Sequence, residues 1–281
     1  MLATKPVPSL ALTKIKNRGN TMLEVTPIRA FNDNYLWLFR EAGSRDCGIV
    51  DPGDAEPVLQ YLKEQNLNLA VIIITHHHGD HTGGISQLLE NYNVPVYGPD
   101  SSNIPAVTHA VKEGSQINIL GHNFEVLEIP GHTLDHIAYF GAAVENNTPV
   151  LFCGDTLFAG GCGRVFEGTF PMMHESLQKL ARLPADTLVY CAHEYTLANL
   201  CFASAVTPDN KTLAERVALE KEKRSKDIPT VPTSIKAELE TNPFLRCGEQ
   251  EIIAAATEYC GRALHAPEEV FGAIRGWKDS F

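Results

Sequence analysis

The chain has 281 residues, which suits one large domain or a domain with an appendage. Its 23 Lys and Arg against 34 Asp and Glu give a net charge of −11, which disfavours nucleic acid and anionic lipid as partners. Hydrophobic residues make up 44% of the chain, enough for a substantial core. No apolar run approaches the roughly 20 residues of a membrane span, so we expect a globular protein without a membrane partner.

The first 21 residues are basic and contain no Asp or Glu. Their apolar stretch around Leu10 is shorter than the roughly 7–15 residues of a secretory signal. An organellar transit peptide stays open as an alternative, although the arginine content is low for one. We interpret residues 1–21 as an N-terminal extension without structure of its own and expect the fold to begin near Met22.

From Met22 to about residue 100 the chain alternates strands with helices. Asp54 is a candidate N-cap for the first helix, and an apolar run before His76 predicts a strand buried on both faces. The predicted strands here are residues 23–29, 35–40, 47–51, 71–75 and 94–97. The predicted helices are residues 55–65 and 83–92.

The middle of the chain continues with short strands, and the last third changes to helices. Pro208 and Pro267 are candidate first residues of helices, and Gly261 is a candidate C-cap. The predicted strands are residues 117–120, 124–129, 137–140, 150–153 and 187–191. The predicted helices are residues 172–183, 196–204, 208–226, 233–239, 249–260 and 267–278. We therefore expect an α/β body over residues 22–194 and a helical domain over residues 195–281.

The seven cysteines are odd in number, widely spaced and without a CxxC pair. In a chain of this size that pattern indicates reduced thiols, not a disulfide framework or a zinc ribbon. It favours a reducing, cytoplasmic compartment.

Directly after the apolar run come four potential metal ligands within six positions: His76, His78, Asp80 and His81. Imidazole nitrogen and carboxylate oxygen suit Zn²⁺, and also Fe²⁺ or Mn²⁺. The end of a strand is where open α/β folds place their chemistry.

Three further potential ligands, His132, Asp155 and His193, each follow a predicted strand. Together the strand ends supply five histidines and two aspartates. Seven ligands are too many for one tetrahedral ion that keeps an open position. Two ions, each with three terminal ligands and one shared carboxylate, would use all seven.

This HxHxDH motif, followed by a lone His, an Asp and a final His, resembles the metallo-β-lactamase superfamily. The surrounding segments resemble its hydroxyacylglutathione hydrolase (glyoxalase II) family, from residue 22 to the end of the chain. These segments are Ala30-Phe-Asn-Asp-Asn-Tyr35, Gly154-Asp-Thr-Leu-Phe158, Gly161-Cys-Gly163, His193-Glu-Tyr195, Thr241-Asn-Pro-Phe244 and Arg275-Gly-Trp-Lys-Asp279. The resemblance implies an αββα sandwich with a C-terminal helical domain.

The resemblance also implies a ligand set. His76, His78 and His132 would bind one metal, Asp80, His81 and His193 the other, and Asp155 would bridge the two. His77 is not a ligand in the family pattern and would point away, whereas His136 would support the site from behind.

The implied reaction is hydrolysis of S-D-lactoylglutathione, or another S-(2-hydroxyacyl)glutathione, to glutathione and the hydroxy acid, the second step of methylglyoxal detoxification. A hydroxide bridging two metals, zinc in the first instance and iron or manganese as alternatives, would attack the thioester, with Asp80 and Asp155 as the catalytic carboxylates. The resemblance places the glutathione contacts on four residues: Arg164, Tyr195, Arg275 and Lys278. The family has Lys where this chain has Arg164 and Tyr where it has Phe166. We expect a monomer.

Three alternatives stay open at this point. An iron-dependent sulfur or oxygen oxidoreductase of the same fold is the first, but di-iron relatives have Glu where His78 stands, and persulfide dioxygenases lack the helical tail. A lactamase or an RNA-processing nuclease is the second, and the acidic charge disfavours RNA. A non-catalytic metal-binding protein is the third, although a buried set of seven ligands is costly without a metal to hold.

Overall fold

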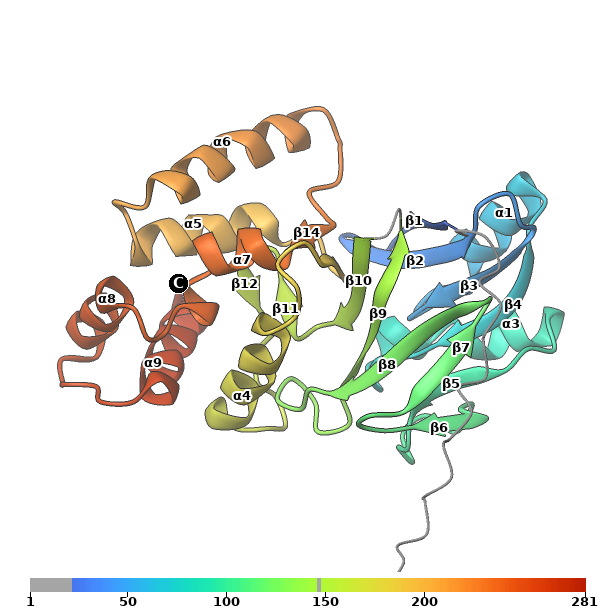
Figure 1. Ribbon diagram of the computed structural model, residues 1–281, viewed down its shortest axis with the longest axis horizontal. Coiled ribbons are helices and arrows are strands. Elements are labelled where there is room, and N and C mark those ends of the chain that lie inside the picture. Colours follow the sequence, from blue (N-terminus) through green and yellow to red (C-terminus); the bar gives the residue numbers. More distant parts are fainter. Residues whose placement is uncertain (1–21, 146–147) are drawn as a thin grey trace, which may run out of the picture.

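The computed structural model describes residues 22–145 and 148–281, so the predicted extension at residues 1–21 lies outside the described residues. Two six-stranded sheets face each other, with helices on their outer sides (Figure 1). The first sheet consists, in spatial order, of β1 (Leu23–Ala30), β2 (Asn34–Glu41), β3 (Asp46–Val50), β4 (Asn68–Ile73), β5 (Val96–Pro99) and β6 (His109–Val111). The second consists of β14 (Thr233–Ser234), β13 (Leu188–Cys191), β10 (Thr148–Gly154), β9 (Ile137–Glu145), β8 (His122–Glu128) and β7 (Gln116–Ile119). A short hairpin, β11 (Leu157–Phe158) and β12 (Gly161–Cys162), follows β10.

Side chains of the first sheet alternate between two hydrophobic cores, because successive residues of a strand point to opposite faces. Along β2, Trp37 and Phe39 enter the core between the sheets, and Leu36 and Leu38 enter the core under the outer helices. Phe39 packs with its ring centroid 5.6 Å from that of Phe152 in the second sheet. The apolar side chains at the end of β4 alternate between the same two cores. The prediction of a strand buried on both faces is therefore confirmed.

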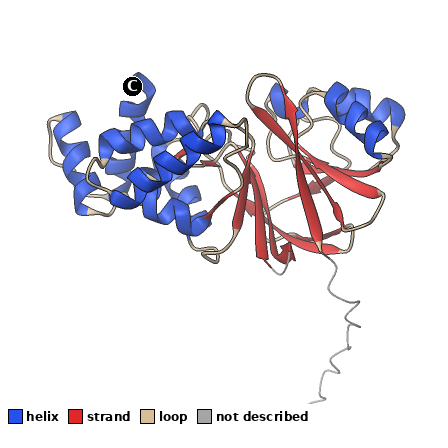
Figure 2. Ribbon diagram, turned by 90° about the horizontal axis from the view of Figure 1, so that it is seen from above, coloured by secondary structure: helices blue, strands red, loops and turns tan. Residues whose placement is uncertain are grey.

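The helices that cover the first sheet are α1 (Ala55–Gln65) and α3 (Ile85–Asn91), with the single turn α2 (Gly79–Thr82) between them in sequence. Asp54 caps α1 by accepting a hydrogen bond from the backbone N–H of Glu56, as predicted. On the other side of the molecule α4 (Phe170–Ala181) follows the hairpin (Figure 1). Seen from above, the strands lie between a small and a large group of helices, so the predicted αββα sandwich is confirmed (Figure 2).

The large group contains the helices of the last third: α5 (Thr196–Val206), α6 (Lys211–Ser225), α7 (Ile235–Thr241), a 3₁₀ turn at Pro243–Leu245, α8 (Gln250–Cys260) and α9 (Pro267–Ser280). Gly261 ends α8 with a φ of +67°, and Pro267 is the first residue of α9, both as predicted. This stretch is joined to the body, because its strand β14 pairs with β13 and α9 packs against α4. Within the described residues no helix is both long and apolar enough to cross a membrane.

Two helix starts and one missed strand show why the structure differs from the predictions in places. Helix α6 begins at Lys211, not at Pro208, because the side chain of Asn210 caps it by accepting from the N–H of Leu213. Helix α7 begins at Ile235, since the two residues before it pair with β13. The prediction also missed β6, a three-residue edge strand too short to show an alternating pattern.

Candidate metal centre

Four strand ends from the two sheets meet at one edge of the sandwich, and each carries predicted ligands. The loop after β4 holds His76, His78, Asp80 and His81, and single ligands follow β8, β10 and β13. The structure brings all seven together in two groups of three with Asp155 between them. In each group the potential ligand atoms lie within 4.8 Å of one another.

The first ligand group consists of His76, His78 and His132. Nδ1 of His78 lies 3.1 Å from Nε2 of His76 and 3.0 Å from Nε2 of His132. Nδ1 of His132 donates to the backbone carbonyl of Arg164 at 2.8 Å, and Nδ1 of His76 lies 3.0 Å from the hydroxyl of Thr75. In both His132 and His76 the hydrogen-bond partner lies at Nδ1. Nε2 of each ring is therefore left to point at the space that the three histidines share.

The second ligand group consists of Asp80, His81 and His193. Nε2 of His81 and Nε2 of His193 each lie 3.5 Å from Oδ2 of Asp80. Asp155 contacts both groups, because its Oδ2 is 3.5 Å from Nε2 of His132 and 3.3 Å from Nε2 of His193. One carboxylate therefore lies where it can serve two ions.

A third geometric group, Asp51 with His76 and His81, is already satisfied by hydrogen bonds. Oδ1 of Asp51 accepts from the backbone N–H of Thr75 at 2.7 Å. Oδ2 accepts from the Thr75 hydroxyl at 2.7 Å and from Nδ1 of His81 at 3.0 Å. The oxygens of Asp51 are thus taken up by hydrogen bonds, one of which orients the predicted ligand His81. In the sequence Asp51 stands only at the end of a predicted strand.

Two buried polar atoms of the centre have no hydrogen-bond partner: Nε2 of His81 and Oδ1 of Asp155. An unsatisfied buried acceptor costs about 1–3 kcal/mol, so such atoms are rare in folded proteins. A metal ion on each side of Asp155 would satisfy both. The donor set and these two atoms fit a dinuclear metal site, as the sequence predicted.

The pKa values of the carboxylates and of His76 prepare the centre for cations. Burial alone would raise the pKa of Asp155, but the charge of His81, 3.5 Å away, and the contact with His193 at 3.3 Å hold it well below its usual range. His193 and His81, each 3.5 Å from Oδ2 of Asp80, also lower the pKa of Asp80. Burial lowers the pKa of His76 well below 6.5, which keeps that ring neutral. Burial lowers the pKa of His81 and His193, but the neighbouring carboxylates, Asp155 above all, raise it above 6.5 in both rings. Because ionised carboxylates and neutral imidazoles are the forms that bind metals, a metal ion would have to displace the protons on these two rings.

Glycines let the backbone come close to the ligands. A Cβ on Gly163 would overlap the carbonyl oxygen of Asp155 and lie 3.1 Å from Nδ1 of His132. A Cβ on Gly53 would overlap the carbonyl oxygen of Asp80. Any side chain at these two positions would displace a ligand-bearing loop.

His77 and His136 lie as the sequence analysis expected. His77 turns away from the centre, with Nδ1 2.9 Å from Asp135 and Nε2 3.2 Å from Glu167. The ring of His136 stacks on His76 at 4.5 Å, and its Nε2 accepts from the backbone N–H of Asp155 at 3.1 Å. His136 therefore supports a predicted ligand of the first group and the carboxylate residue that lies between the groups.

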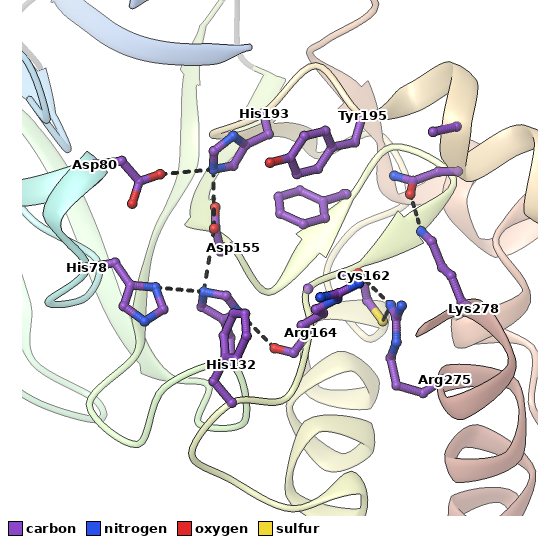
Figure 3. A pocket seen from close by; sticks show the side chains of 15 residues that line it. His78, Asp80, His132, Asp155, Cys162, Arg164, His193, Tyr195, Arg275 and Lys278 are labelled. Carbon is purple, nitrogen blue, oxygen red and sulfur yellow. Dashed lines mark hydrogen bonds and ion pairs between the residues drawn. The ribbon is translucent and has the colours of Figure 1, made fainter. Parts of the chain in front are cut away.

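A cavity of about 510 Å³ leads from the ligands to the helices of the last third. All four residues predicted to contact glutathione line it: Arg164, Tyr195, Arg275 and Lys278 (Figure 3). Tyr195 stacks on the ligand His193, with ring centroids 4.7 Å apart. Lys278 hydrogen-bonds to Asn199, a cavity residue that the sequence analysis missed because nothing near it marks a site.

The two arginines of the cavity differ in exposure. The side chain of Arg164 is 60% exposed, whereas that of Arg275 is 3% exposed. Arg275 donates through Nη1 to the carbonyl of Cys162 at 3.0 Å and through Nη2 to Asp279 at 3.1 Å. Asp279 also lies 3.2 Å from Nε of Arg164, so one carboxylate links both arginines. Arg275 is engaged with the protein before any ligand arrives.

Two family models match the chain. Residues 34–193 match the metallo-beta-lactamase superfamily, and residues 194–281 match the hydroxyacylglutathione hydrolase C-terminus. The hydroxyacylglutathione hydrolases of Nitrosomonas eutropha and Pseudomonas paraeruginosa are each 50% identical to the chain, over 92% of this chain and 100% of the relative. The crystal structure of ETHE1 from Myxococcus xanthus matches with a TM-score of 0.60 and 24% identity, covering 92% of this chain and 99% of that one. The structural match supports the fold alone.

Proposed function

The chain belongs to the hydroxyacylglutathione hydrolase family of the metallo-beta-lactamase superfamily, and on that premise we propose that it hydrolyses S-D-lactoylglutathione to glutathione and D-lactate. This reaction would be the second step of methylglyoxal detoxification. The observation that carries the proposal is a carboxylate shared by two ligand groups at the end of a cationic cavity. A glutathione thioester carries its scissile carbonyl on the sulfur of the central cysteine, several bonds away from the carboxylate of its glycine. Such a molecule suits a cavity with the metal centre at one end and cationic side chains further along.

The proposed ligand assignment follows the two groups. His76, His78 and His132 hold one ion and Asp80, His81 and His193 the other, with Asp155 bound to both. Bound divalent ions polarise a carbonyl and lower the pKa of water to near neutrality. We favour zinc because the donors are imidazole and carboxylate, with iron and manganese as alternatives.

The protein's own residues position the reaction. The ionised Asp80 and Asp155 hold negative charge next to the centre and are the catalytic carboxylates of the proposal. Asp155 is kept in place from behind by the hydrogen bond between its backbone N–H and His136. The departing thiolate of glutathione is a stable anion, so no acid residue is required to protonate it.

Substrate binding is assigned to the far end of the cavity. Arg164 and Lys278 would pair with a carboxylate of glutathione, Arg275 would add charge from the wall, and Tyr195 would contact the substrate beside the centre. In this proposal residues 22–194 form the catalytic domain and residues 195–281 the substrate-binding domain. One chain carries both ligand groups and the cavity, which supports a monomeric enzyme. All seven cysteines are free thiols, which supports a reducing compartment such as the cytoplasm.

Hydrolysis of S-D-lactoylglutathione by the purified protein tests the proposal. Turnover should be lost after chelation and return with zinc. The Asp155→Ala variant should lose both turnover and bound metal, whereas Asp209→Ala, in the exposed loop before α6, should keep both. Normal turnover and metal content in Asp155→Ala would refute the dinuclear assignment. A protein with two bound metals and no turnover would refute the substrate.

A further inference from the structure

The two ligand groups are oriented by different kinds of partner. In the first group, His132 donates to a backbone carbonyl and His76 contacts a hydroxyl. In the second group, both histidines donate through Nδ1 to carboxylates, His81 to Asp51 and His193 to Asp33. We propose that Asp33 is a positioning residue for His193 and, with Asp51, makes the second group the tighter of the two metal sites.

Asp33 lies in the turn between β1 and β2, far from the ligands in sequence. Its Oδ1 accepts from Nδ1 of His193 at 2.8 Å, across a separation of 160 residues. A ring that donates through Nδ1 presents the lone pair of Nε2, and Nε2 of His193 faces Asp155 at 3.3 Å. Asp33 therefore selects the tautomer and the ring orientation that a metal requires.

The turn is held in place by the backbone on both sides of the contact. The N–H of Glu194 donates to the carbonyl of Asp33 at 2.9 Å, and the N–H of Tyr35 donates to the carbonyl of Ala192 at 2.7 Å. At the start of the turn Phe31 has a φ of +51°, a conformation that bulky residues rarely adopt. The backbone thus holds Asp33 beside His193, and only its short side chain has to be ordered to make the contact.

Asn34, the first residue of β2, holds the third ligand of the same group. Nδ2 of Asn34 donates to Oδ2 of Asp80 at 3.0 Å, and Asn34 is buried. Each member of the second group therefore has its own orienting partner: Asn34 for Asp80, Asp51 for His81 and Asp33 for His193. Two of these partners, Asp33 and Asn34, are adjacent in the chain at the junction of the turn and β2.

The two sites also differ in the number of carboxylates around them. Asp155 is common to both, but the second group adds the carboxylate of Asp80 and is supported by those of Asp33 and Asp51. A carboxylate that accepts from an imidazole raises the basicity of the ring and stabilises the cation that the ring binds. Within the described residues, the partner of Nδ1 of His132 is a backbone carbonyl, and Nδ1 of His76 reaches a carboxylate only through the Thr75 hydroxyl, which donates to Asp51. A divalent ion is therefore held more tightly by the second group.

This inference rests on the proposed ligand assignment and not on the substrate, so metal binding tests it without an activity assay. The full-length protein is stripped with a chelator and titrated with zinc in competition with a chromophoric chelator, which yields two dissociation constants. In Asp33→Ala the tighter constant should weaken about 10- to 100-fold, the usual loss when a ligand's hydrogen-bond partner is removed. The weaker constant should stay near its wild-type value.

Asp33→Asn is the conservative variant, because its amide oxygen can still accept from Nδ1 but carries no charge. Its tighter constant should fall between those of wild type and Asp33→Ala, an order that general damage to the fold would not produce. Asp209→Asn is the matched control and should leave both constants unchanged. In His132→Ala, which removes a ligand of the first group, the tighter constant should remain.

The role of Asp33 would be overturned if Asp33→Ala and Asp33→Asn left both zinc dissociation constants unchanged. It would also be overturned if the two variants weakened both constants by the same factor. Loss of the tighter constant in His132→Ala would overturn the ranking of the sites. A wild-type protein that binds one zinc ion would instead overturn the ligand assignment on which the inference rests.

Discussion

Replacing Arg275 by methionine separates a structural role from a binding role at the wall of the cavity. Methionine keeps the unbranched apolar stem of the side chain and removes its charge and all of its hydrogen bonds. The buried guanidinium donates to the carbonyl of Cys162 in the hairpin and lies 5.1 Å above the ring of Phe244. These contacts tie α9 to the hairpin that forms one side of the cavity. We therefore expect Arg275→Met to lower the stability of the protein and not only its affinity for substrate.

The structure allows the loss to be estimated. A hydrogen bond from a charged group contributes about 1.5–3 kcal/mol, and a desolvated cation–π contact about 2 kcal/mol. The ion pair with Asp279, whose side chain is 37% exposed, adds about 0–1 kcal/mol. Removing the cost of burying the guanidinium offsets part of this sum. We expect a net loss of about 2–4 kcal/mol, or a fall in Tm of about 4–16 °C for a chain of this size.

Urea and thermal unfolding of the metal-loaded protein measure the effect, with hydrolysis kinetics alongside. Arg262→Met is the matched control, because the side chain of Arg262 is 63% exposed and its one acidic partner lies 3.9 Å away. That variant should unfold like the wild type. An Arg275→Met protein with wild-type stability and only a higher KM would refute the reasoning and make Arg275 a direct substrate contact.

Three further outcomes follow from the cavity and its surroundings. Burial lowers the pKa of Lys278 to about 8, so its ammonium is present below that pH and is lost above it. KM should therefore rise as the pH increases through about 8. Lys278→Arg, whose side chain does not titrate there, should abolish this rise in KM. Phe166→Tyr should lower KM about 2- to 12-fold if the new hydroxyl contributes a hydrogen bond of about 0.5–1.5 kcal/mol, and an unchanged KM would show that the hydroxyl finds no partner on the substrate. Glu238→Ala should lower the free energy of unfolding in urea by about 3–5 kcal/mol, because Glu238 is fully buried and Arg216, with which it pairs, would lose its counter-charge. The control is Glu240→Ala, because Glu240 is exposed on the same helix. Equal stabilities of the two variants would contradict this expectation.

Much of the fold could be predicted because its signals are local. Asp54 and Gly261 mark helix ends through the capping contacts that they make within one turn of the helix. The apolar run of β4 indicates a strand whose two faces are both buried. Boundaries failed where a partner outside the helix decided them, as at α7, whose start depends on pairing with β13. The extent of a strand is set by the strand beside it, which a local pattern does not contain.

The same distinction applies to the site. The sequence by itself determined which seven side chains could bind metal, because they stand at the ends of strands with ligand chemistry in the right order. Only the tertiary structure decided that Asp51 and Asp33 orient the histidines, that Asn34 holds Asp80, and that Arg275 is buried against Cys162. These contacts join residues 30 to 160 positions apart. A hydrogen bond at that separation depends on how the strands are brought together in space, and it leaves no periodicity or spacing in the chain.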